Sequence, residues 1–173
     1  MYNLPYEVVE LTTSDSVRLH SYLLKHSHLT PNTAPTIVFF HGNAGNIGQR
    51  LSIANYLFNY CESNVFLVEY RGYGLSEGYA CEKGFYRDAE AAINYLLTRS
   101  DIDTTKIIVF GQSIGGAVVI DLATKFNNKL FGLIVENTFT SLPDIGRDLF
   151  GGIPGVGYLP DICFKNQVGF SFT

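Results

Sequence analysis

Two short runs with the residue preferences of β-strands open the chain, at residues 6–12 and 17–24. Four turn-forming residues, TSDS at positions 13–16, separate them. Two strand-like runs joined by such a cluster are typical of a β-hairpin. The sequence therefore predicts that the chain begins with two antiparallel strands.

Beyond the hairpin, continuous apolar runs alternate with segments whose apolar residues recur at helical spacing. The run TIVFF at residues 36–40 is β-branched and aromatic throughout, which is typical of a strand buried on both faces. From residue 47 to residue 60 the apolar positions instead match one face of a helix. The same order then repeats, with strands expected at 65–68, 107–110 and 133–135 and helices at 84–97 and 117–126.

This regular alternation indicates an α/β fold, because parallel neighbours in a sheet need long crossover connections. We expect a mostly parallel sheet with helices on both faces and the N-terminal antiparallel hairpin, all in one domain over residues 1–173. Residues 1–138 would form the core sheet and helices. The Gly- and Pro-rich residues 139–173 would form a cap-like segment and tail. Functional loops are expected at the carboxyl ends of the strands.

The pentapeptide GQSIG at residues 111–115 has the G-x-S-x-G pattern of a nucleophile elbow. It follows the apolar strand KIIVF and precedes a helix rich in Ala, Val and Ile, as that motif requires. So sharp a turn leaves no room for side chains beside the serine, which explains Gly111 and Gly115, and Gly116 gives further space for close packing. The pentapeptide alone often occurs by chance. With its strand and helix in place, it predicts that Ser113 is a catalytic nucleophile.

The negative charge that develops on an attacked carbonyl oxygen needs nearby N–H donors. The backbone N–H of Ile114, at the start of the helix, is predicted to be one donor. The loop HGNAG at residues 41–45 follows an earlier strand, and we predict the backbone N–H of Asn43 as the second donor. Gly42 and Gly45 are the glycines that shape this loop.

A serine nucleophile also needs a histidine to accept its proton and a carboxylate to orient that histidine, and in this motif class both follow the serine. No histidine follows Ser113, and His41 is expected to make a structural hydrogen bond. The remaining histidines, His20, His26 and His28, are expected to be exposed at strand ends. The triad Asp and His are therefore expected to be absent from this chain. Four aspartates do follow the serine, and each is expected to be a solvated or capping residue: Asp121, Asp144, Asp148 and Asp161.

Composition narrows the range of partners. Hydrophobic residues make up 46% and charged residues 16% of the chain, as in ordinary globular proteins. The net charge is −4 and no basic stripe occurs, so nucleic acid is not an expected partner. The longest apolar stretch, residues 114–120, is far too short to span a bilayer, and we expect a soluble chain. No residue spacing indicates a metal or any other cofactor, and the three cysteines are expected to be reduced and buried.

Four stretches occur in order along the chain: HGNAGNIG, EYRGYGLSEG, IIVFGQSIGGAVVIDLA and VENTFTSLP. Together they resemble the α/β-hydrolase domain-containing protein 13 group, related to the Bem46-type proteins of fungi, from about residue 6 to about residue 166. The resemblance implies an α/β-hydrolase fold with Ser113 as nucleophile. Members of that group carry an N-terminal membrane anchor and a C-terminal third that holds the triad Asp and His. The chain thus resembles a C-terminally truncated member that lacks the last strands, so that residues 133–135 would form an exposed edge.

The resemblance also implies hydrolysis of an acyl ester, thioester or amide, in a small molecule or a lipidated protein. Protein depalmitoylation is among the activities suggested for relatives, which are also grouped with serine aminopeptidases. One alternative is a non-catalytic product that binds a ligand or partner through its crevice or its open sheet edge. Another is a chain that does not fold by itself. The acyl group, the compartment and the oligomeric state stay open.

Overall fold

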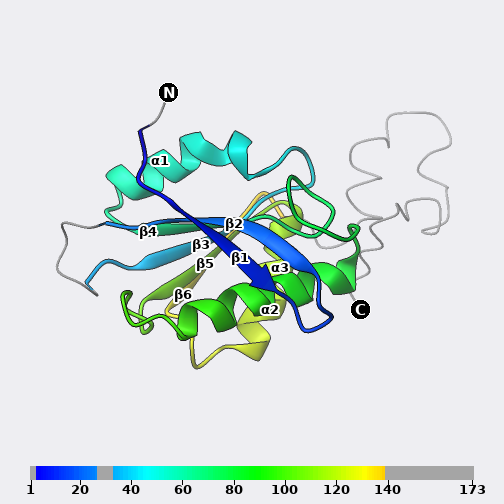
Figure 1. Ribbon diagram of the computed structural model, residues 1–173. Helices are drawn as coiled ribbons and strands as arrows, with labels where there is room; N and C mark the ends of the chain where they lie inside the picture. The colour runs from blue at the N-terminus through cyan, green and yellow to red at the C-terminus, as the bar shows by residue number, and fades with distance from the viewer. Residues whose placement is uncertain (1–2, 27–32, 139–173) are drawn as a thin grey trace, which may run out of the picture.

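A computed structural model of the chain describes residues 3–26 and 33–138 (Figure 1). Six strands form one sheet in the order β1-β2-β4-β3-β5-β6. Their bounds are Glu7–Thr12 for β1, Arg18–Leu24 for β2, Thr36–Phe40 for β3, Asn64–Val68 for β4, Ile107–Gln112 for β5 and Gly132–Glu136 for β6.

The pairing within this sheet matches the predicted α/β fold. Strands β1 and β2 are antiparallel, and β2 runs antiparallel to β4. The remaining pairs, β4 with β3, β3 with β5 and β5 with β6, are parallel. A mostly parallel sheet that begins with an antiparallel hairpin is therefore confirmed. The carboxyl ends of β3, β4, β5 and β6 lie at one edge of the sheet, where the loops carry the predicted motifs.

Within the described ranges three α-helices connect the strands, and two of them differ from the expected bounds. The segment predicted as one helix begins as a 3₁₀ turn, η1 (Ile47–Arg50), and continues as α1 (Leu51–Asn59). Helix α2 (Glu82–Leu97) closely follows its predicted range. Helix α3 (Ile114–Lys125) begins three residues earlier than expected, because the turn at Ser113 leads directly into it.

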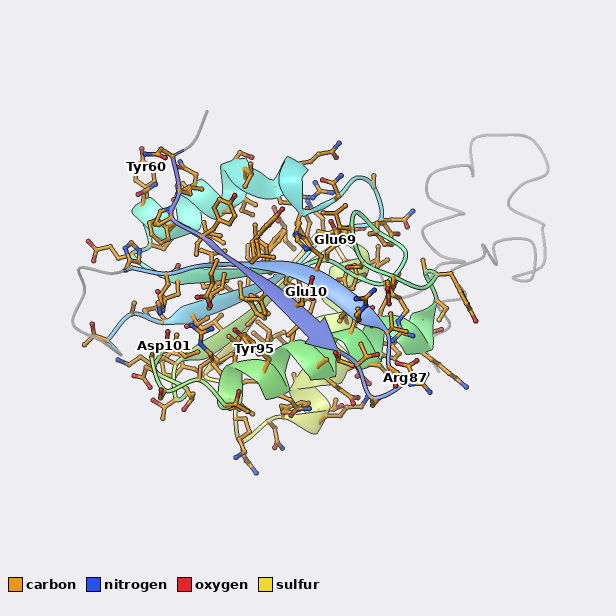
Figure 2. The ribbon with its side chains drawn as sticks, viewed as in Figure 1. Glu10, Tyr60, Glu69, Arg87, Tyr95 and Asp101 are labelled. Carbon is orange, nitrogen blue, oxygen red and sulfur yellow. The ribbon has the colours of Figure 1, made fainter. Side chains whose placement is uncertain are left out.

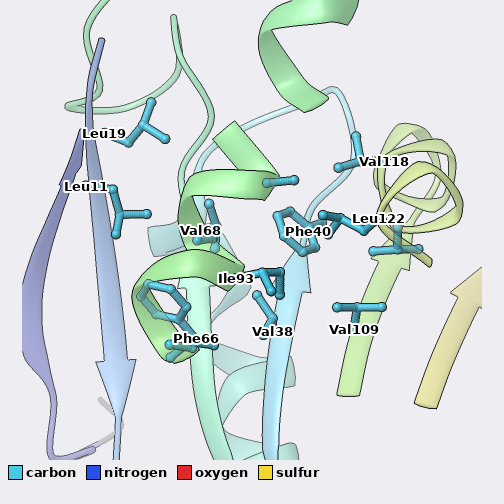
Figure 3. Packing of buried hydrophobic residues seen from close by; sticks show 14 of the residues in the cluster. Leu11, Leu19, Val38, Phe40, Phe66, Val68, Ile93, Val109, Val118 and Leu122 are labelled. Atoms are coloured by element: carbon cyan, nitrogen blue, oxygen red, sulfur yellow. The ribbon is translucent and has the colours of Figure 1, made fainter. Parts of the chain in front are cut away.

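The helices cover both faces of the sheet, with α1 on one face and α2 and α3 on the other (Figure 1). Alternate residues of β3 reach the two layers: Ile37 and Phe39 pack on the α1 side, and Val38 and Phe40 pack on the side of α2 and α3 (Figure 3). Full burial of a large apolar side chain stabilises a fold by roughly 1.5–3 kcal/mol. Burial on both faces explains why the four residues after Thr36 in β3 are all apolar.

The outermost strand β6 is exposed, as the sequence predicted. Among the described residues, β6 pairs only with β5. Its side chains keep large exposed fractions, 44% for Leu133, 41% for Ile134 and 38% for Val135, and the preceding Phe131 is 69% exposed. The described structure therefore ends on a strand with apolar residues in contact with water and a free row of backbone hydrogen-bonding groups.

Some expectations about single residues were wrong. His20 and His26 are half-buried rather than exposed, because β2 lies inside the sheet and the His26 ring stacks on Phe58 with 3.8 Å between ring centroids. Cys61 is exposed, since it follows the end of α1 at the surface, whereas Cys81 is half-buried. Further residues discussed from sequence lie outside the described part of the chain: His28, Asp144, Asp148, Cys163 and the cap-like segment 139–173.

Candidate active site

Ser113 occupies a strained turn between β5 and α3. Its backbone has φ 55° and ψ −118°, a conformation that residues with side chains rarely adopt. The two flanking glycines make the turn possible, because a Cβ on Gly111 would overlap the carbonyl oxygen of Gly115, and one on Gly115 would overlap that of Phe40. Strain of this kind concentrates at functional sites. The structure thus has a sharp turn from strand to helix at the predicted position, and its role as a nucleophile elbow stays a prediction.

The end of β6 and Thr138, two residues beyond it, hold the backbone of this turn on both sides. The Ser113 N–H donates to the carbonyl oxygen of Glu136 at 2.9 Å, and the Thr138 hydroxyl donates to the Ser113 carbonyl oxygen at 2.8 Å. Gly116 makes room for this contact, since a Cβ there would overlap the Thr138 side chain. In addition, the Gln112 side-chain amide donates to the Glu136 carboxylate at 3.0 Å. The nucleophile position therefore depends on the neighbouring strand.

Replacing Thr138 by valine is expected to destabilise the folded chain by about 1 kcal/mol, because the isosteric valine lacks the hydroxyl that bonds to Ser113. Urea unfolding of the wild type, Thr138→Val and Thr138→Ser would measure the effect. Thr138→Ser keeps the hydroxyl and should lose clearly less stability than Thr138→Val. A Thr138→Val variant as stable as the wild type would contradict the prediction, because valine keeps the methyl group and lacks only the hydroxyl that makes this hydrogen bond.

The loop after β3 lies against the serine. A Cβ on Gly42 would lie 3.3 Å from the Cβ of Ser113, so the loop backbone passes directly beside the nucleophile. Asn43 follows and is exposed, and its side-chain oxygen accepts a 2.7 Å hydrogen bond from the Tyr73 hydroxyl. Gly45 adopts the left-handed φ of 80° that the turn requires. The loop that contains Asn43 and the first residue of α3, Ile114, thus both adjoin Ser113.

The N–H of Ile114 is suited to the role predicted for it. Ile114 is the first residue of α3, so its N–H has no partner within the helix, and the helix dipole favours negative charge at this point. The assignments of Ile114 and Asn43 as oxyanion donors stay predictions.

His41 is fully buried and has both ring nitrogens engaged away from the serine. Its Nδ1 lies 2.7 Å from the carbonyl oxygen of Gly42, and its Nε2 lies 2.9 Å from Oε1 of Glu69. The predicted structural role of His41 is confirmed. With both nitrogens committed, this ring has none left to accept a proton from Ser113.

Sequence reasoning missed the residues after β4 that hold the loop after β3. Glu69 is 1% exposed and contacts His41, while the Tyr70 hydroxyl donates to the His41 carbonyl oxygen at 3.4 Å. Burial and the nearby charge of Glu69 raise the pKa of Tyr73, which keeps the phenol protonated as a donor to Asn43. The available signal was a carboxylate placed directly after a fully apolar strand.

A buried ion-pair network fixes the rest of the loop after β4. The Arg71 guanidinium binds Asp15 through two bonds of 2.8 and 2.9 Å and donates to Asp88 at 2.8 Å, and Asp88 also accepts the Arg71 backbone N–H. Arg87 adds a 2.7 Å bond to Asp15. Hydrogen bonds from Arg71 hold the pKa of Asp15 well below its ordinary value, whereas burial raises the pKa of Asp88 to about 6. The network ties the β1–β2 turn, the loop and α2 together.

Three further points concern the described residues: the aspartate on α3, groups that could bind a metal, and helices that could span a membrane. Asp121 pairs with Lys125 on α3 at 2.8 Å, as a surface residue would. Within residues 3–26 and 33–138, no three His, Cys, Asp or Glu side chains are grouped so that they could hold a metal ion. No helix in the same ranges has both the length and the apolar character needed to cross a membrane.

Comparison with solved structures places this arrangement in a known fold. An esterase from Pyrococcus furiosus superposes with a TM-score of 0.69 and 21% sequence identity, covering 93% of this chain and 58% of the esterase. A hyperthermophilic esterase from Pyrobaculum calidifontis gives a TM-score of 0.71 and 19% identity, covering 87% of this chain and 51% of that protein. Likeness at this identity shows the fold alone.

Sequence comparison is more specific. Protein bem46 of Schizosaccharomyces pombe is 46% identical over 149 residues, which are 86% of this chain and 50% of that protein. The α/β hydrolase domain-containing protein WAV2 of Arabidopsis thaliana is 47% identical over 144 residues, 83% of this chain and 46% of that protein. The chain thus spans about half the length of the curated relatives it matches. A family model described as serine aminopeptidase, S33, matches residues 31–150. The chain therefore belongs to this α/β-hydrolase family and is a Bem46-type member of it.

Proposed function

We propose that this chain carries the nucleophile and the oxyanion donors of a serine hydrolase that acts on acyl esters or thioesters. One observation carries the proposal: Ser113 has φ 55° at the junction of β5 and α3, with the backbone of Gly42 beside its side chain. A serine held in this strained form and flanked by backbone N–H groups is suited to attack a carbonyl carbon.

In the proposed reaction the Ser113 hydroxyl oxygen forms a bond to the acyl carbon while its proton passes to a base. The N–H groups of Ile114 and Asn43 bind the resulting oxyanion. Collapse of the tetrahedral intermediate breaks the bond to the alcohol or thiol, which leaves with a proton. Water then releases the acid from the acyl-serine by the same steps.

No histidine follows Ser113 in the sequence given, and both ring nitrogens of His41 lie beside oxygen atoms of other groups, so no base is assigned among these residues. We therefore propose that the chain as written has impaired activity. Loss of triad partners lowers rates by several powers of ten, although oxyanion binding alone still accelerates a reaction by about 10³ over water. Longer members of the family would supply the missing groups from the half that this chain does not match.

Names of relatives suggest where such an activity could operate. A relative in Saccharomyces cerevisiae, 37% identical over 139 residues, is called an uncharacterized membrane protein. This is compatible with membrane association of longer members, and hence with a lipidated protein as acyl substrate. Removal of a palmitoyl group from a cysteine is one reaction of this class, and the family description adds amide bonds at peptide N-termini as another.

Labelling by a fluorophosphonate probe tests the proposal, with imidazole added to supply the missing base. The total labelling rate of the folded wild-type chain should be at least about tenfold higher than that of Ser113→Ala. Imidazole should increase the wild-type rate, because the oxyanion donors remain in place. Ser52→Ala, which removes an exposed serine on α1, is the matched control and should label like the wild type. Peptide mass spectrometry would locate the modified residue.

The exposed strand β6 favours one alternative, a non-catalytic protein that binds a partner through this edge. The same experiment separates the two functions. A chain with a cooperative thermal transition that labels no faster than Ser113→Ala, even with imidazole, would support the binding function and contradict the hydrolase.

A further inference from the structure

Glu69 stands where two loops of the candidate site meet. Strands β3 and β4 are parallel neighbours, and Phe40 is paired in register with Val68. The next residues, His41 and Glu69, therefore leave the sheet side by side at its carboxyl edge. Figure 2 shows Glu69 inside the molecule, near the loops that follow these strands.

The two oxygens of this one carboxylate hold both ends of the loop 41–47. Oε1 lies 2.9 Å from Nε2 of His41, the first residue of the loop. Oε2 accepts the backbone N–H of Ile47, the residue with which η1 begins, at 3.1 Å. Gly42 and Asn43 lie between these anchors. One side chain therefore contacts both ends of this loop.

The surroundings are built to accept a carboxylate. Glu69 is 1% exposed, and a buried charge is tolerated only where hydrogen bonds compensate for lost water. The loop after β4 folds back over Glu69 with Gly74 at φ 51°, and a Cβ on Gly74 would overlap the Glu69 carboxylate. The Glu69 carbonyl oxygen accepts a 3.0 Å bond from the Ser76 hydroxyl. These contacts leave the carboxylate little freedom to move.

We propose that Glu69 is a positioning residue, which fixes the loop 41–47 so that the Asn43 N–H points at the oxygen of a substrate attacked by Ser113. The inference rests on the proposed function for its chemical meaning. Glu69 acts through the loop and does not touch the reacting atoms. The Glu69 carboxylate would then serve the site in a role different from that of the triad acid and without bonding to Ser113.

Hydrogen exchange tests the positioning directly, because it does not depend on any activity of the chain. In Glu69→Ala the Ile47 amide loses its acceptor and should exchange at least about tenfold faster, and the amides of residues 42–46 should follow. Glu69→Gln keeps a side chain of the same length and should restore part of the protection. Glu77→Gln changes an exposed glutamate of the loop after β4 that pairs with Arg18, and should leave exchange in the loop 41–47 unchanged.

Probe labelling of Ser113 is the second measurement on the same variants. The inference expects labelling to slow about tenfold in Glu69→Ala, to recover partly in Glu69→Gln and to be unchanged in Glu77→Gln. If Glu69→Ala shows no cooperative unfolding, Glu69→Gln carries the comparison with Glu77→Gln.

The outcomes separate the inference from the proposed function. Unchanged exchange in the loop overturns the inference, whatever the labelling shows. Equal acceleration of exchange in β1 and α3 overturns it too, because Glu69 would then stabilise the whole fold rather than this loop. If the loop exchanges faster but labelling of Ser113 is unchanged, Glu69 holds the loop but does not position the Asn43 N–H for the oxyanion. A wild-type chain that never labels contradicts the proposed hydrolase, and loop exchange still decides whether Glu69 holds the loop.

Discussion

Gly115→Ala is expected to destabilise the folded chain by about 3 kcal/mol or more, among the largest effects of any single methyl group in this fold. The added Cβ would overlap the carbonyl oxygen of Phe40, which belongs to a strand buried on both faces. Neither partner can move away: the clash involves backbone on one side, and α3 packs against the sheet on the other. Urea unfolding followed by circular dichroism would measure the loss.

The matched control for this substitution is Gly132→Ala in β6. A Cβ there would meet only side-chain atoms of Ile108 at 3.8 Å, an ordinary contact. Alanine restricts the unfolded chain more than glycine does, so this variant should keep or slightly raise the stability. If Gly132→Ala lost as much stability as Gly115→Ala, the close approach of α3 to β3 would not be the cause.

Arg71→Met should remove about 3–5 kcal/mol from the free energy of unfolding at neutral pH, because it leaves the fully buried Asp88 without its cation. Asp15 keeps Arg87 as a partner but loses its two bonds to Arg71. Thermal and urea unfolding of the wild type and the variant would give the difference. Methionine fills much of the space of the arginine side-chain methylenes. The loss in the free energy of unfolding therefore measures the removal of the charge more than the creation of a cavity.

The control for the charge is Arg18→Met. Arg18 pairs with Glu77 across the surface, where the two side chains are 67% and 48% exposed and water screens the pair. The midpoint of unfolding should hardly change. A loss as large as that of Arg71→Met would show that burial is not what makes the Arg71 network important.

The loss in Arg71→Met should be smaller at pH 5 than at pH 8. The pKa of Asp88 is raised to about 6 in the folded chain, so its contribution is most favourable when it is protonated and declines as pH rises through 6. Without Arg71 this pKa rises further, which increases the penalty at pH 8. The lowered pKa of Asp15 leaves this comparison unchanged, because its pairing with Arg71 contributes fully above the ordinary value of 3.8 and hence at both pH values.

Local patterns sufficed to predict the strands and the elbow. TIVFF is typical of a strand buried on both faces, and glycines two residues before and after Ser113 match a turn in which a Cβ at either position would overlap backbone. These features depend on residues close together in the chain, where steric rules act directly. The fold class followed from the order of such elements.

Contacts between distant residues were not predictable in the same way. Glu69 meets His41 from 28 positions away, and Thr138 meets Ser113 from 25 positions away. Both contacts depend on which strands become neighbours, and the order β4-β3-β5-β6 cannot be read from the periodicity of any one segment. His26 was misjudged for the same reason, since its stacking on Phe58 follows from the placement of α1.

The position of β6 has a consequence for how the nucleophile responds to its surroundings. This outermost strand leads into the two groups that bond to the amide and carbonyl of Ser113. A segment that paired along the open side of β6 would shift or steady those groups, and through them the attacking oxygen. Binding of a segment along β6 and the reactivity of Ser113 are then thermodynamically linked, so a change in one would be measurable as a change in the other.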